Sequence, residues 1–327
     1  METIVEFTHS GSDAIVTRST GAEFPRETGG HGEFVRQESA FRNNVTADGS
    51  SRFKAEPGRY HLYVSLACPW AHRTIIFRKL KSLEQVVSLS LVDPLRDERG
   101  WAFGEDYPDP INGFRYLSEA YLATDPGFDG RVTVPVLWDR KEGIIVNNES
   151  SEIIRMLYAE FDAWGDTSVD LFPASLRTAI EEINRIVYDN VNNGVYRAGF
   201  ATTQQAYEEA FERLFDTLDF LEKRLARQRY LVGNRMTEAD WRLFTALVRF
   251  DAVYYSHFKC NKWRLIDYPG LWAYTRDLYQ HPGIAETVNM DHIKRHYFMT
   301  HRTINPTGVV PRGPVLDFDE PHGRESL

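Results

Sequence analysis

The sequence predicts an α/β domain followed by an all-α domain, and three observations lead to this class. Between residues 60 and 159, short apolar runs and helical segments follow one another in the order β-α-β and then β-β-α. Beyond about Ala174, apolar residues recur only at three- and four-residue spacing, which is typical of amphipathic helices. The 327 residues also suffice for two cores, because a single core seldom grows past about 250 residues.

The first predicted strand and helix meet at a cysteine. Residues 60–66 alternate in apolar character as a strand does, and Ala71 and Ile75 then recur at helical spacing. Pro69 suits the first helical position, because its missing N–H would be unsatisfied there and its φ is already helical. We therefore expect a helix to begin at Cys68. Free backbone N–H groups next to the sulfur favour the thiolate, so we expect a lowered pKa and a reactive thiol.

A strand, Cys-Pro and a helix is the way in which thioredoxin-like domains present a redox cysteine. Ala71 stands where a Cys-X-X-Cys pair would have its second cysteine, so Cys68 needs an external thiol, for which glutathione is the usual candidate. The structural alternative for a single cysteine is a small buried hydrophobic residue. We assign that structural role to Cys260, in the polar run HFKCNKW. Two cysteines so far apart predict no disulfide framework.

Further elements of the α/β domain follow along the chain: a strand at 86–92, a polar insertion at 93–131 with at most a short helix near 117–123, strands at 132–139 and 143–148, and a helix from 149 to about 159. Before this domain, residues 1–57 are rich in Gly, Ser, Thr and charge. That composition is typical of an extended arm lying over a domain.

Two places in this domain point to a thiol ligand. Pro135 lies inside a strand pattern, which normally indicates a plain edge strand. In thioredoxin-like domains, however, a cis-proline here leaves the backbone N–H and C=O of Val134 open to a thiol ligand. Ser150 at the next helix start is most often a cap, but the same helix N-terminus can hold a carboxylate, and Glu149 can pair with an ammonium. The γ-glutamyl end of glutathione carries both groups.

The helical half shows three long stretches with helical spacing, at 175–196, 204–226 and 238–255, and residues 237–240 resemble a capping box in which Asp240 replaces Glu or Gln. The predicted parts of the chain are an N-terminal extension (1–57), a thioredoxin-like domain that binds glutathione (58–165), an all-helical domain (170–300) and a C-terminal tail (301–327). A thioredoxin-like domain followed by an all-helical domain is the arrangement of glutathione S-transferases.

Eight sequence blocks carry a closer resemblance. CPWAHRT, GWAFGEDYPDPINGF, GRVTVPVLWD, NNESSEIIRM, NNGVYRAGFA, LFTALVRFD, YQHPGIAETV and TINPTG strongly resemble the Xi-class glutathione transferases, also called glutathionyl-hydroquinone reductases. The resemblance covers about residues 34–323. It implies glutathione-dependent reduction of S-glutathionyl-hydroquinones to hydroquinones, with glutathione as co-substrate and no metal. It also implies a homodimer joined through the helical domains.

The resemblance further implies roles for the residues singled out above. Cys68 is similar in position to the nucleophile of that family, which forms a mixed disulfide with glutathione. Val134 corresponds to the backbone partner of the cysteinyl group of glutathione. Glu149 and Ser150 correspond to the γ-glutamyl site.

Four more residues match family positions. By resemblance, Trp101 contacts glutathione through packing and Arg131 through its charge on a carboxylate. Tyr196 and Tyr297 match tyrosines of the helical domain that face the hydroquinone. From the residues alone, ordinary roles stay open: core packing for the three aromatic residues and a surface ion pair for Arg131.

The net charge and the remaining motifs argue against nucleic-acid-binding, membrane and zinc-dependent proteins. A net charge of −9 argues against nucleic acid or an anionic membrane as main partner. The first residues lack a basic region followed by an apolar core, and no uncharged run approaches membrane-spanning length, so we expect a cytoplasmic protein. His292 and His296 have the i,i+4 spacing of a zinc pair, but no third ligand is evident, and we expect them on a solvated helix face.

Two competing functions remain to be separated from the reductase. A conjugating glutathione transferase would keep glutathione itself as nucleophile and would need a Ser or Tyr hydroxyl near the first strand, where this chain has Cys68. A non-catalytic binding protein with the same fold would not need the cysteine.

Overall fold

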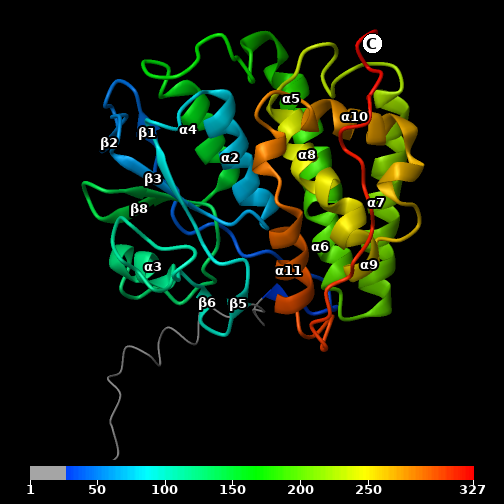
Figure 1. Ribbon diagram of the computed structural model, residues 1–327, viewed down its shortest axis with the longest axis horizontal. Helices are drawn as coiled ribbons and strands as arrows, with labels where there is room; N and C mark the ends of the chain where they lie inside the picture. The colour runs from blue at the N-terminus through cyan, green and yellow to red at the C-terminus, as the bar shows by residue number, and fades with distance from the viewer. Residues whose placement is uncertain (1–26) are drawn as a thin grey trace, which may run out of the picture.

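A four-stranded sheet organises the first half of the chain, of which the computed structural model describes residues 27–327 (Figure 1). The strand order is β4 (Ser88–Leu91), β3 (Tyr60–Val64), β7 (Val136–Asp139) and β8 (Ile144–Asn147). Strand β3 pairs parallel with β4 and antiparallel with β7, and β7 pairs antiparallel with β8. This topology is the β-α-β and β-β-α order that the sequence predicts, and it is the sheet of a thioredoxin-like domain.

Helices cover the sheet and connect it to the second half of the chain. Helices α2 (Pro69–Leu80) and α4 (Ser150–Ala159) pack against each other, and α2 also packs against a helix of the second half. The insertion carries α3 (Ser118–Thr124), which contacts β8, close to its predicted place. It also contains a short antiparallel pair, β5 (Arg96–Asp97) and β6 (Gly100–Trp101), which the sequence did not predict.

The described part of the predicted arm runs along the edge of the sheet. The backbone N–H of Asn43 donates to the carbonyl of Val146 at 3.0 Å, so the arm covers the exposed edge of β8. Further along, β1 (Val45–Thr46) and β2 (Phe53–Lys54) pair with each other. Residues 1–26 of the predicted arm lie outside the described residues.

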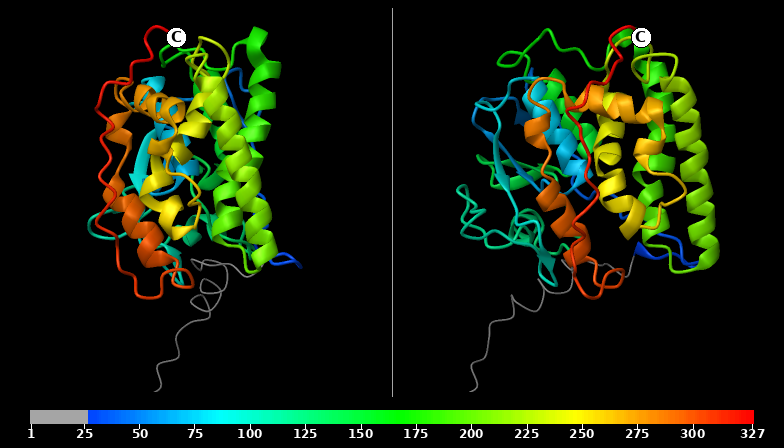
Figure 2. Two further views of the ribbon diagram at one scale, coloured as in Figure 1. Left: turned by 90° about the vertical axis from the view of Figure 1, so that its right-hand side faces the viewer. Right: turned by 45° about the vertical axis from the view of Figure 1, so that its right-hand side comes forward.

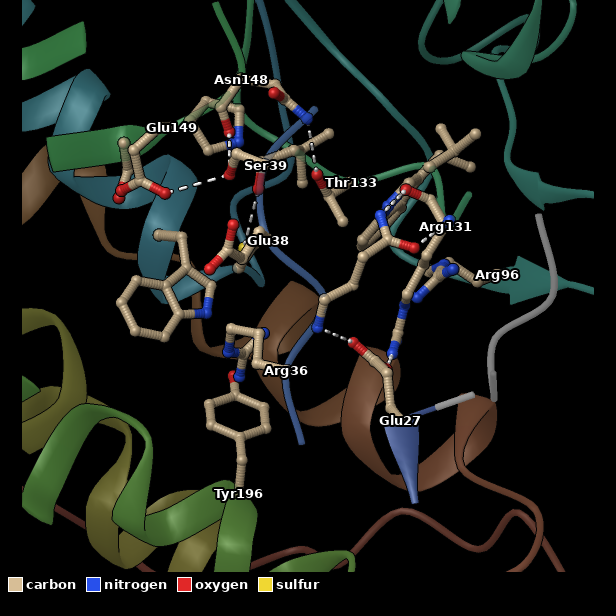
Figure 3. A pocket seen from close by; sticks show the side chains of 18 of the residues that line it. Glu27, Arg36, Glu38, Ser39, Arg96, Arg131, Thr133, Asn148, Glu149 and Tyr196 are labelled. Atoms are coloured by element: carbon tan, nitrogen blue, oxygen red, sulfur yellow. Dashed lines mark hydrogen bonds and ion pairs between the residues drawn. The ribbon is translucent and has the colours of Figure 1, made fainter. Parts of the chain in front are cut away.

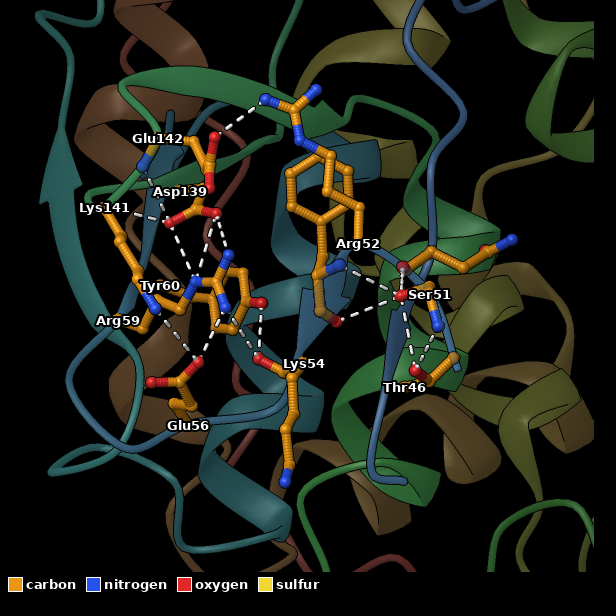
Figure 4. Close-up of polar contacts among 12 residues, drawn as sticks. Thr46, Ser51, Arg52, Lys54, Glu56, Arg59, Tyr60, Asp139, Lys141 and Glu142 are labelled. Atoms are coloured by element: carbon orange, nitrogen blue, oxygen red, sulfur yellow. Dashed lines mark hydrogen bonds and ion pairs between the residues drawn. The ribbon is translucent and has the colours of Figure 1, made fainter. Parts of the chain in front are cut away.

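A buried ion pair fixes the start of the central strand (Figure 4). The Arg59 guanidinium donates to both oxygens of Asp139, at the end of β7, with a shortest distance of 2.6 Å. The Tyr60 hydroxyl donates to the carbonyl of Lys54 in β2 at 2.7 Å. Because these groups come from the arm and from two strands, they hold the arm and the sheet in register.

The second half consists of helices, as predicted: η2 (Ala174–Leu176), α5 (Arg177–Val187), η3 (Tyr188–Asn192), α6 (Gly194–Gly199), α7 (Gln204–Leu225), α8 (Glu238–Arg249), η4 (Phe250–Tyr254), α9 (Tyr255–His257), η5 (Leu265–Asp267), α10 (Pro269–Tyr279), η6 (Ala285–Thr287) and α11 (Met290–Thr300). Helix α8 is the one that packs against α2. Among the described residues, no helix is both long and apolar enough to cross a membrane.

Two of the predicted long helices are interrupted. The stretch 175–196 divides into α5, the π-helical segment η3 and α6, and α8 passes into a second π-helical segment, η4. Apolar spacing does not distinguish a single π turn from α-helix, and π turns are frequent at functional sites. Tyr188 of η3 forms part of the wall of the cavity described below, and Tyr254 of η4 contacts Tyr297, which also lines that cavity.

The tail after residue 300 lies over the outside of the helical half without helix or strand, as predicted (Figure 2). Its end is anchored by Arg324, whose guanidinium donates to the carbonyls of Leu225 at 2.9 Å and Gln228 at 2.8 Å. Earlier in the tail, the ring of Phe318 stacks on that of Tyr279. The tail therefore joins the ends of α7 and α10.

The predicted capping box is confirmed at the start of α8. The Asp240 carboxylate accepts from the backbone N–H of Thr237 at 2.8 Å. It also accepts from the N–H of Leu231 and the hydroxyl of Tyr274, both at 2.8 Å. Asp240 is fully buried. It therefore caps α8 and also acts as a junction, because its carboxylate connects the start of α8 to Leu231 and to Tyr274 of α10.

Replacing Asp240 by Ala should lower the free energy of unfolding by about 3 kcal/mol, because several buried donors lose their acceptor together. Thr203→Ala is the matched control, since the Thr203 hydroxyl caps α7 at an exposed site, accepting from the N–H of Ala206 and donating to the carbonyl of His31. That control should cost about 1 kcal/mol. Urea unfolding of both variants measures the difference, and equal losses would contradict the junction role.

Candidate active site

One cavity lies between the arm, the α/β half and the helical half, and all eight residues predicted for the site line it. Figure 3 labels Arg131, Glu149 and Tyr196 among them. The eight residues are Cys68, Trp101, Arg131, Val134, Glu149, Ser150, Tyr196 and Tyr297. They come from six separate segments of the chain. Their meeting in one cavity is what a binding site for a single ligand requires.

Cys68 sits where the sequence places it. It is the N-cap residue of α2, and Pro69 occupies the first helical position. Its Sγ lies 3.5 Å from the carbonyl oxygen of Val134. The Val134–Pro135 peptide bond is cis, as predicted. The sulfur therefore faces the backbone of Val134, the group expected to receive a thiol ligand.

The expected lowering of the Cys68 pKa is wrong for the structure without ligand. Burial raises the pKa of the Cys68 thiol above its ordinary value. The N–H groups of Trp70 and Ala71 and the charges of Arg249 and Arg36 act in the opposite direction without reversing it. Helix N-termini favour thiolates where water can also solvate the charge, and burial within the cavity opposes that solvation.

A buried arginine holds the turn before Cys68, and sequence reasoning missed it. Arg249 at the end of α8 donates to the carbonyls of Leu66 and Ala67, at 2.9 Å each. Its Nη1 lies 3.0 Å from Nδ1 of His72, whose Nε2 lies 2.7 Å from the hydroxyl of Thr287. Because arginine only donates, His72 must accept through Nδ1. An arginine directly after the apolar residues ALV in the block LFTALVRFD was the available signal.

Glu149 rather than Ser150 caps α4, which corrects the expectation that the serine is the capping residue. The Glu149 carboxylate accepts from the N–H of Ser151 at 3.0 Å and from the hydroxyl of Ser39 at 3.0 Å. Burial works to raise the pKa of Glu149, but these bonds and the charge of Arg73 outweigh it and leave the pKa below its ordinary value. Glu149 is therefore ionised at neutral pH and suited to bind an ammonium.

Ser150 is held from the opposite side by Arg73 of α2. The buried guanidinium donates to Ser150 Oγ at 3.3 Å and to Asn192 Oδ1, in η3, at 2.8 Å. Sequence reasoning also missed Arg73, although it stands in the block CPWAHRT. It joins the expected γ-glutamyl site to the helical half.

Trp101 and Arg131 form the other end of the cavity. The indole of Trp101 stacks on the ring of His296, with the ring centres 4.9 Å apart. Arg131 forms an ion pair with Glu27, and the side-chain amide of Gln37 accepts from its backbone N–H at 2.7 Å. This ion pair is largely buried, which differs from the surface pair considered for Arg131. Glu27 and Gln37 belong to the arm, and no motif marked them.

Tyr196 and Tyr297 contact each other, with their hydroxyl oxygens 2.6 Å apart. The hydroxyl of Tyr254 lies 3.2 Å from that of Tyr297 and completes a chain of three. Burial raises the pKa of Tyr196 and of Tyr297, so both stay protonated at neutral pH and can donate hydrogen bonds. The cavity is thus lined both by Cys68 and by the phenol groups of Tyr196 and Tyr297, which can donate hydrogen bonds.

The prediction of a solvated helix face for His292 and His296 is wrong. Both are buried: His292 Nε2 lies 2.8 Å from the hydroxyl of Tyr107, and His296 Nδ1 lies 2.7 Å from the carbonyl of Pro94. The insertion at 93–131 covers this face of α11, which spacing within one helix does not reveal. Within residues 27–327, no three His, Cys, Asp or Glu side chains are grouped to bind a metal.

Cys260 is fully buried, which agrees with its predicted structural role, and neither cysteine forms a disulfide.

The fold and the cavity define a glutathione transferase. The family model of the glutathione S-transferase N-terminal domain matches residues 67–160. The model of the glutathione S-transferase C-terminal domain matches residues 204–277. The cysteine at the start of α2 lies within the first match and the capping box of α8 within the second.

Individual relatives show which kind of glutathione transferase this chain is similar to. Glutathionyl-hydroquinone reductase YqjG of Escherichia coli is 55% identical over 319 residues, which cover 94% of each chain. Glutathionyl-hydroquinone reductase PcpF of Sphingobium chlorophenolicum is 54% identical over 87% of this chain and 90% of its own. The glutathione-bound structure of YqjG superposes with a TM-score of 0.86 at 56% identity and covers 88% of this chain and 96% of its own.

The Xi glutathione S-transferase structure from Phanerochaete chrysosporium superposes with a TM-score of 0.88 at 48% identity, over 91% of this chain and 98% of its own. The chain therefore belongs to the glutathione S-transferase family and, within it, to the Xi class.

Alkylation of Cys68 by iodoacetamide should have its pH midpoint above that of N-acetylcysteine measured in parallel, because only the thiolate reacts and burial raises its pKa. A Cys260→Ala background leaves Cys68 as the single thiol. The alkylation rate should still be rising at a pH where the free thiol has reached its plateau. A midpoint below that of N-acetylcysteine would contradict the dominance of burial.

Proposed function

We propose that this chain is a glutathionyl-hydroquinone reductase, which converts S-glutathionyl-hydroquinones to hydroquinones and takes glutathione as co-substrate. The observation that carries the proposal is a cavity with one unpaired cysteine, Cys68, and the hydrogen-bonded tyrosines Tyr196 and Tyr297. A thiol without a resolving cysteine suits exchange with an external thiol. The 54% and 55% identity to two relatives that bear this name supports it.

The first half-reaction transfers the glutathionyl group to the protein. The Cys68 thiolate attacks the sulfur of the substrate, an S–S bond forms, and the bond from sulfur to the ring carbon breaks. An aryl carbanion is a poor leaving group, so the ring reacts as its keto tautomer, in which that carbon already carries a proton. The electron pair then ends on the ring oxygen, which takes up the proton that Cys68 gave up. Hydroxyls of Tyr196 and Tyr297 stabilise the ring oxygens.

The second half-reaction restores the thiol. A glutathione thiolate attacks the Cys68 sulfur of the mixed disulfide, glutathione disulfide leaves, and Cys68 regains a proton. The two halves together consume one glutathione and one glutathionyl-hydroquinone and give one hydroquinone and one glutathione disulfide. This order is a ping-pong cycle.

In this proposal, glutathione binds along the wall of the cavity that lies away from Tyr196 and Tyr297. The Val134 backbone pairs with the cysteinyl group, Glu149 takes the ammonium, and Ser150 with the N-terminus of α4 takes the α-carboxylate. Trp101 packs against the peptide, and Arg131 binds the glycyl carboxylate. Because Glu27 already contacts Arg131, that carboxylate shares the guanidinium with the arm.

The competing functions fit the cavity less well. A conjugating transferase activates glutathione with a hydroxyl, and here a sulfur stands at the start of α2. A non-catalytic binding protein gains nothing from a thiol that faces the cavity. We further propose that the protein is cytoplasmic and forms a homodimer joined through the helical halves. Light scattering of the purified chain tests whether it is a dimer.

Cys68→Ser should abolish the reduction of glutathionyl-hydroquinones, by about a thousandfold or more, because a hydroxyl cannot form the mixed disulfide. Glutathione binding should remain measurable by calorimetry, since the shape of the site is kept. Cys260→Ser serves as the control for loss of a thiol outside the cavity. Near-wild-type turnover by the Cys68 variant would refute the mechanism.

Tyr196→Phe and Tyr297→Phe should each lower turnover of glutathionyl-hydroquinones by about 10²–10³-fold, the usual cost of a lost donor at developing charge. Glutathione-dependent reduction of bis(2-hydroxyethyl) disulfide should change little, because that substrate has no ring oxygen. Tyr207→Phe is the matched control, since its hydroxyl donates to the carbonyl of Lys259 at the surface. Equal loss on both substrates would remove the tyrosines from the hydroquinone site.

A further inference from the structure

Arg36 of the arm reaches into the cavity that holds Cys68 (Figure 3). Its guanidinium carbon lies 4.9 Å from the centre of the Trp70 ring and 4.8 Å from that of Tyr196. Its Nε donates to Asn193 Oδ1 at 2.8 Å. The charged group is thus fixed against both halves of the protein, and its position is not that of a freely moving surface arginine.

Two donors on this wall have no acceptor among the described residues. Both Arg36 Nη2 and Trp70 Nε1 are shielded from solvent and take part in no hydrogen bond there. None of the ion pairs in the described part of the chain involves Arg36. A buried donor without an acceptor is costly, so a pair of them beside a cavity indicates that a ligand supplies an oxygen.

The other ligand groups expected in the cavity have their own partners. The glutathione carboxylates are assigned to Ser150 and Arg131, and the ammonium to Glu149. The remaining oxygens belong to the aromatic ring, next to Tyr196. A guanidinium prefers an anionic oxygen to a neutral hydroxyl, because a charge-assisted hydrogen bond is about twice as strong.

We propose that Arg36, with Trp70 as second donor, binds the ionised ring oxygen of the aromatic substrate and makes the protein prefer hydroquinones with acidic hydroxyls. This inference rests on the proposed function. Ionisation also assists the chemistry: the ring hydroxyl gives up its proton, the oxyanion pushes an electron pair toward the ring carbon that bears sulfur, and that carbon takes up a proton in its place, which gives the keto tautomer before the C–S bond breaks. After the bond breaks, the electron pair returns to the same oxygen, where the guanidinium stabilises it.

The charge of Arg36 is also among the influences that oppose the burial-driven rise in the pKa of Cys68 and of Tyr196. Removing it therefore leaves less thiolate for every substrate. A test of substrate preference must therefore compare kcat/KM for two aromatic substrates as a ratio. The lowered thiolate fraction of Cys68 affects both values equally and cancels in that ratio.

The test compares glutathionyl adducts of methyl- and chloro-hydroquinone, whose substituents are similar in size but shift the acidity of the ring hydroxyl in opposite directions. Wild-type protein should prefer the chloro adduct in kcat/KM. Arg36→Gln should reduce the chloro-to-methyl ratio about tenfold, and Arg36→Lys, which keeps the charge, should preserve most of it. Arg42→Gln is the matched control, because Arg42 lies in the same arm but pairs with Glu152 outside the cavity. An unchanged ratio in Arg36→Gln would overturn the proposal.

A second measurement needs no variant. Bound 4-nitrophenol should be more ionised than the free phenol at the same pH, which its absorption spectrum reports, and binding in the neutral form would overturn the proposal. If the wild-type protein reduces neither adduct, the proposed function fails, and the nitrophenol spectrum still decides whether Arg36 forms an anion site.

Discussion

The structure of the site depends on one buried guanidinium, that of Arg249. In the turn before Cys68, Ala67 is fully buried and Leu66 partly so, and the carbonyls of both have Arg249 as their donor. Since buried carbonyls need partners, the turn keeps its shape only while α8 is docked against α2. The position of the sulfur is therefore a property of the interface between the two halves. Removing one partner of such a buried charged contact typically costs several kcal/mol.

This constraint gives a physical reason for the residues that follow the cysteine. His72 accepts from Arg249 on one ring nitrogen and contacts Thr287 through the other. Arg73 extends from the same helix to Ser150 and to η3 of the helical half. Only the first residues of CPWAHRT therefore face the cavity. The later ones, His72 and Arg73, attach α2 to the helical half. The motif therefore positions the cysteine as well as supplying it.

Much of the fold and of the assigned site could be predicted from the sequence, because they depend on patterns among residues that are close together in the chain. Strand alternation, the Cys68-Pro69 pair and the capping box before α8 depend on neighbours in sequence, and they agree with the structure. Features that depend on distant segments were missed or wrong. The direction of the Cys68 pKa shift follows from burial in a cavity that distant segments form together, and the surroundings of His296 follow from the insertion that covers α11. Arg36 stands in a polar segment where nothing in the local pattern distinguishes a cavity residue from a surface one.

In the proposed mechanism, the sulfur held at this interface carries the glutathionyl group between two substrates. Intact-mass measurement after mixing the protein with one equivalent of a glutathionyl-hydroquinone, in the absence of free glutathione, tests it directly. We expect one glutathione adduct, located on Cys68 by peptide mapping, one equivalent of released hydroquinone, and loss of the adduct when glutathione is added. Release of hydroquinone without an adduct, or an adduct on Cys260, would contradict the mechanism.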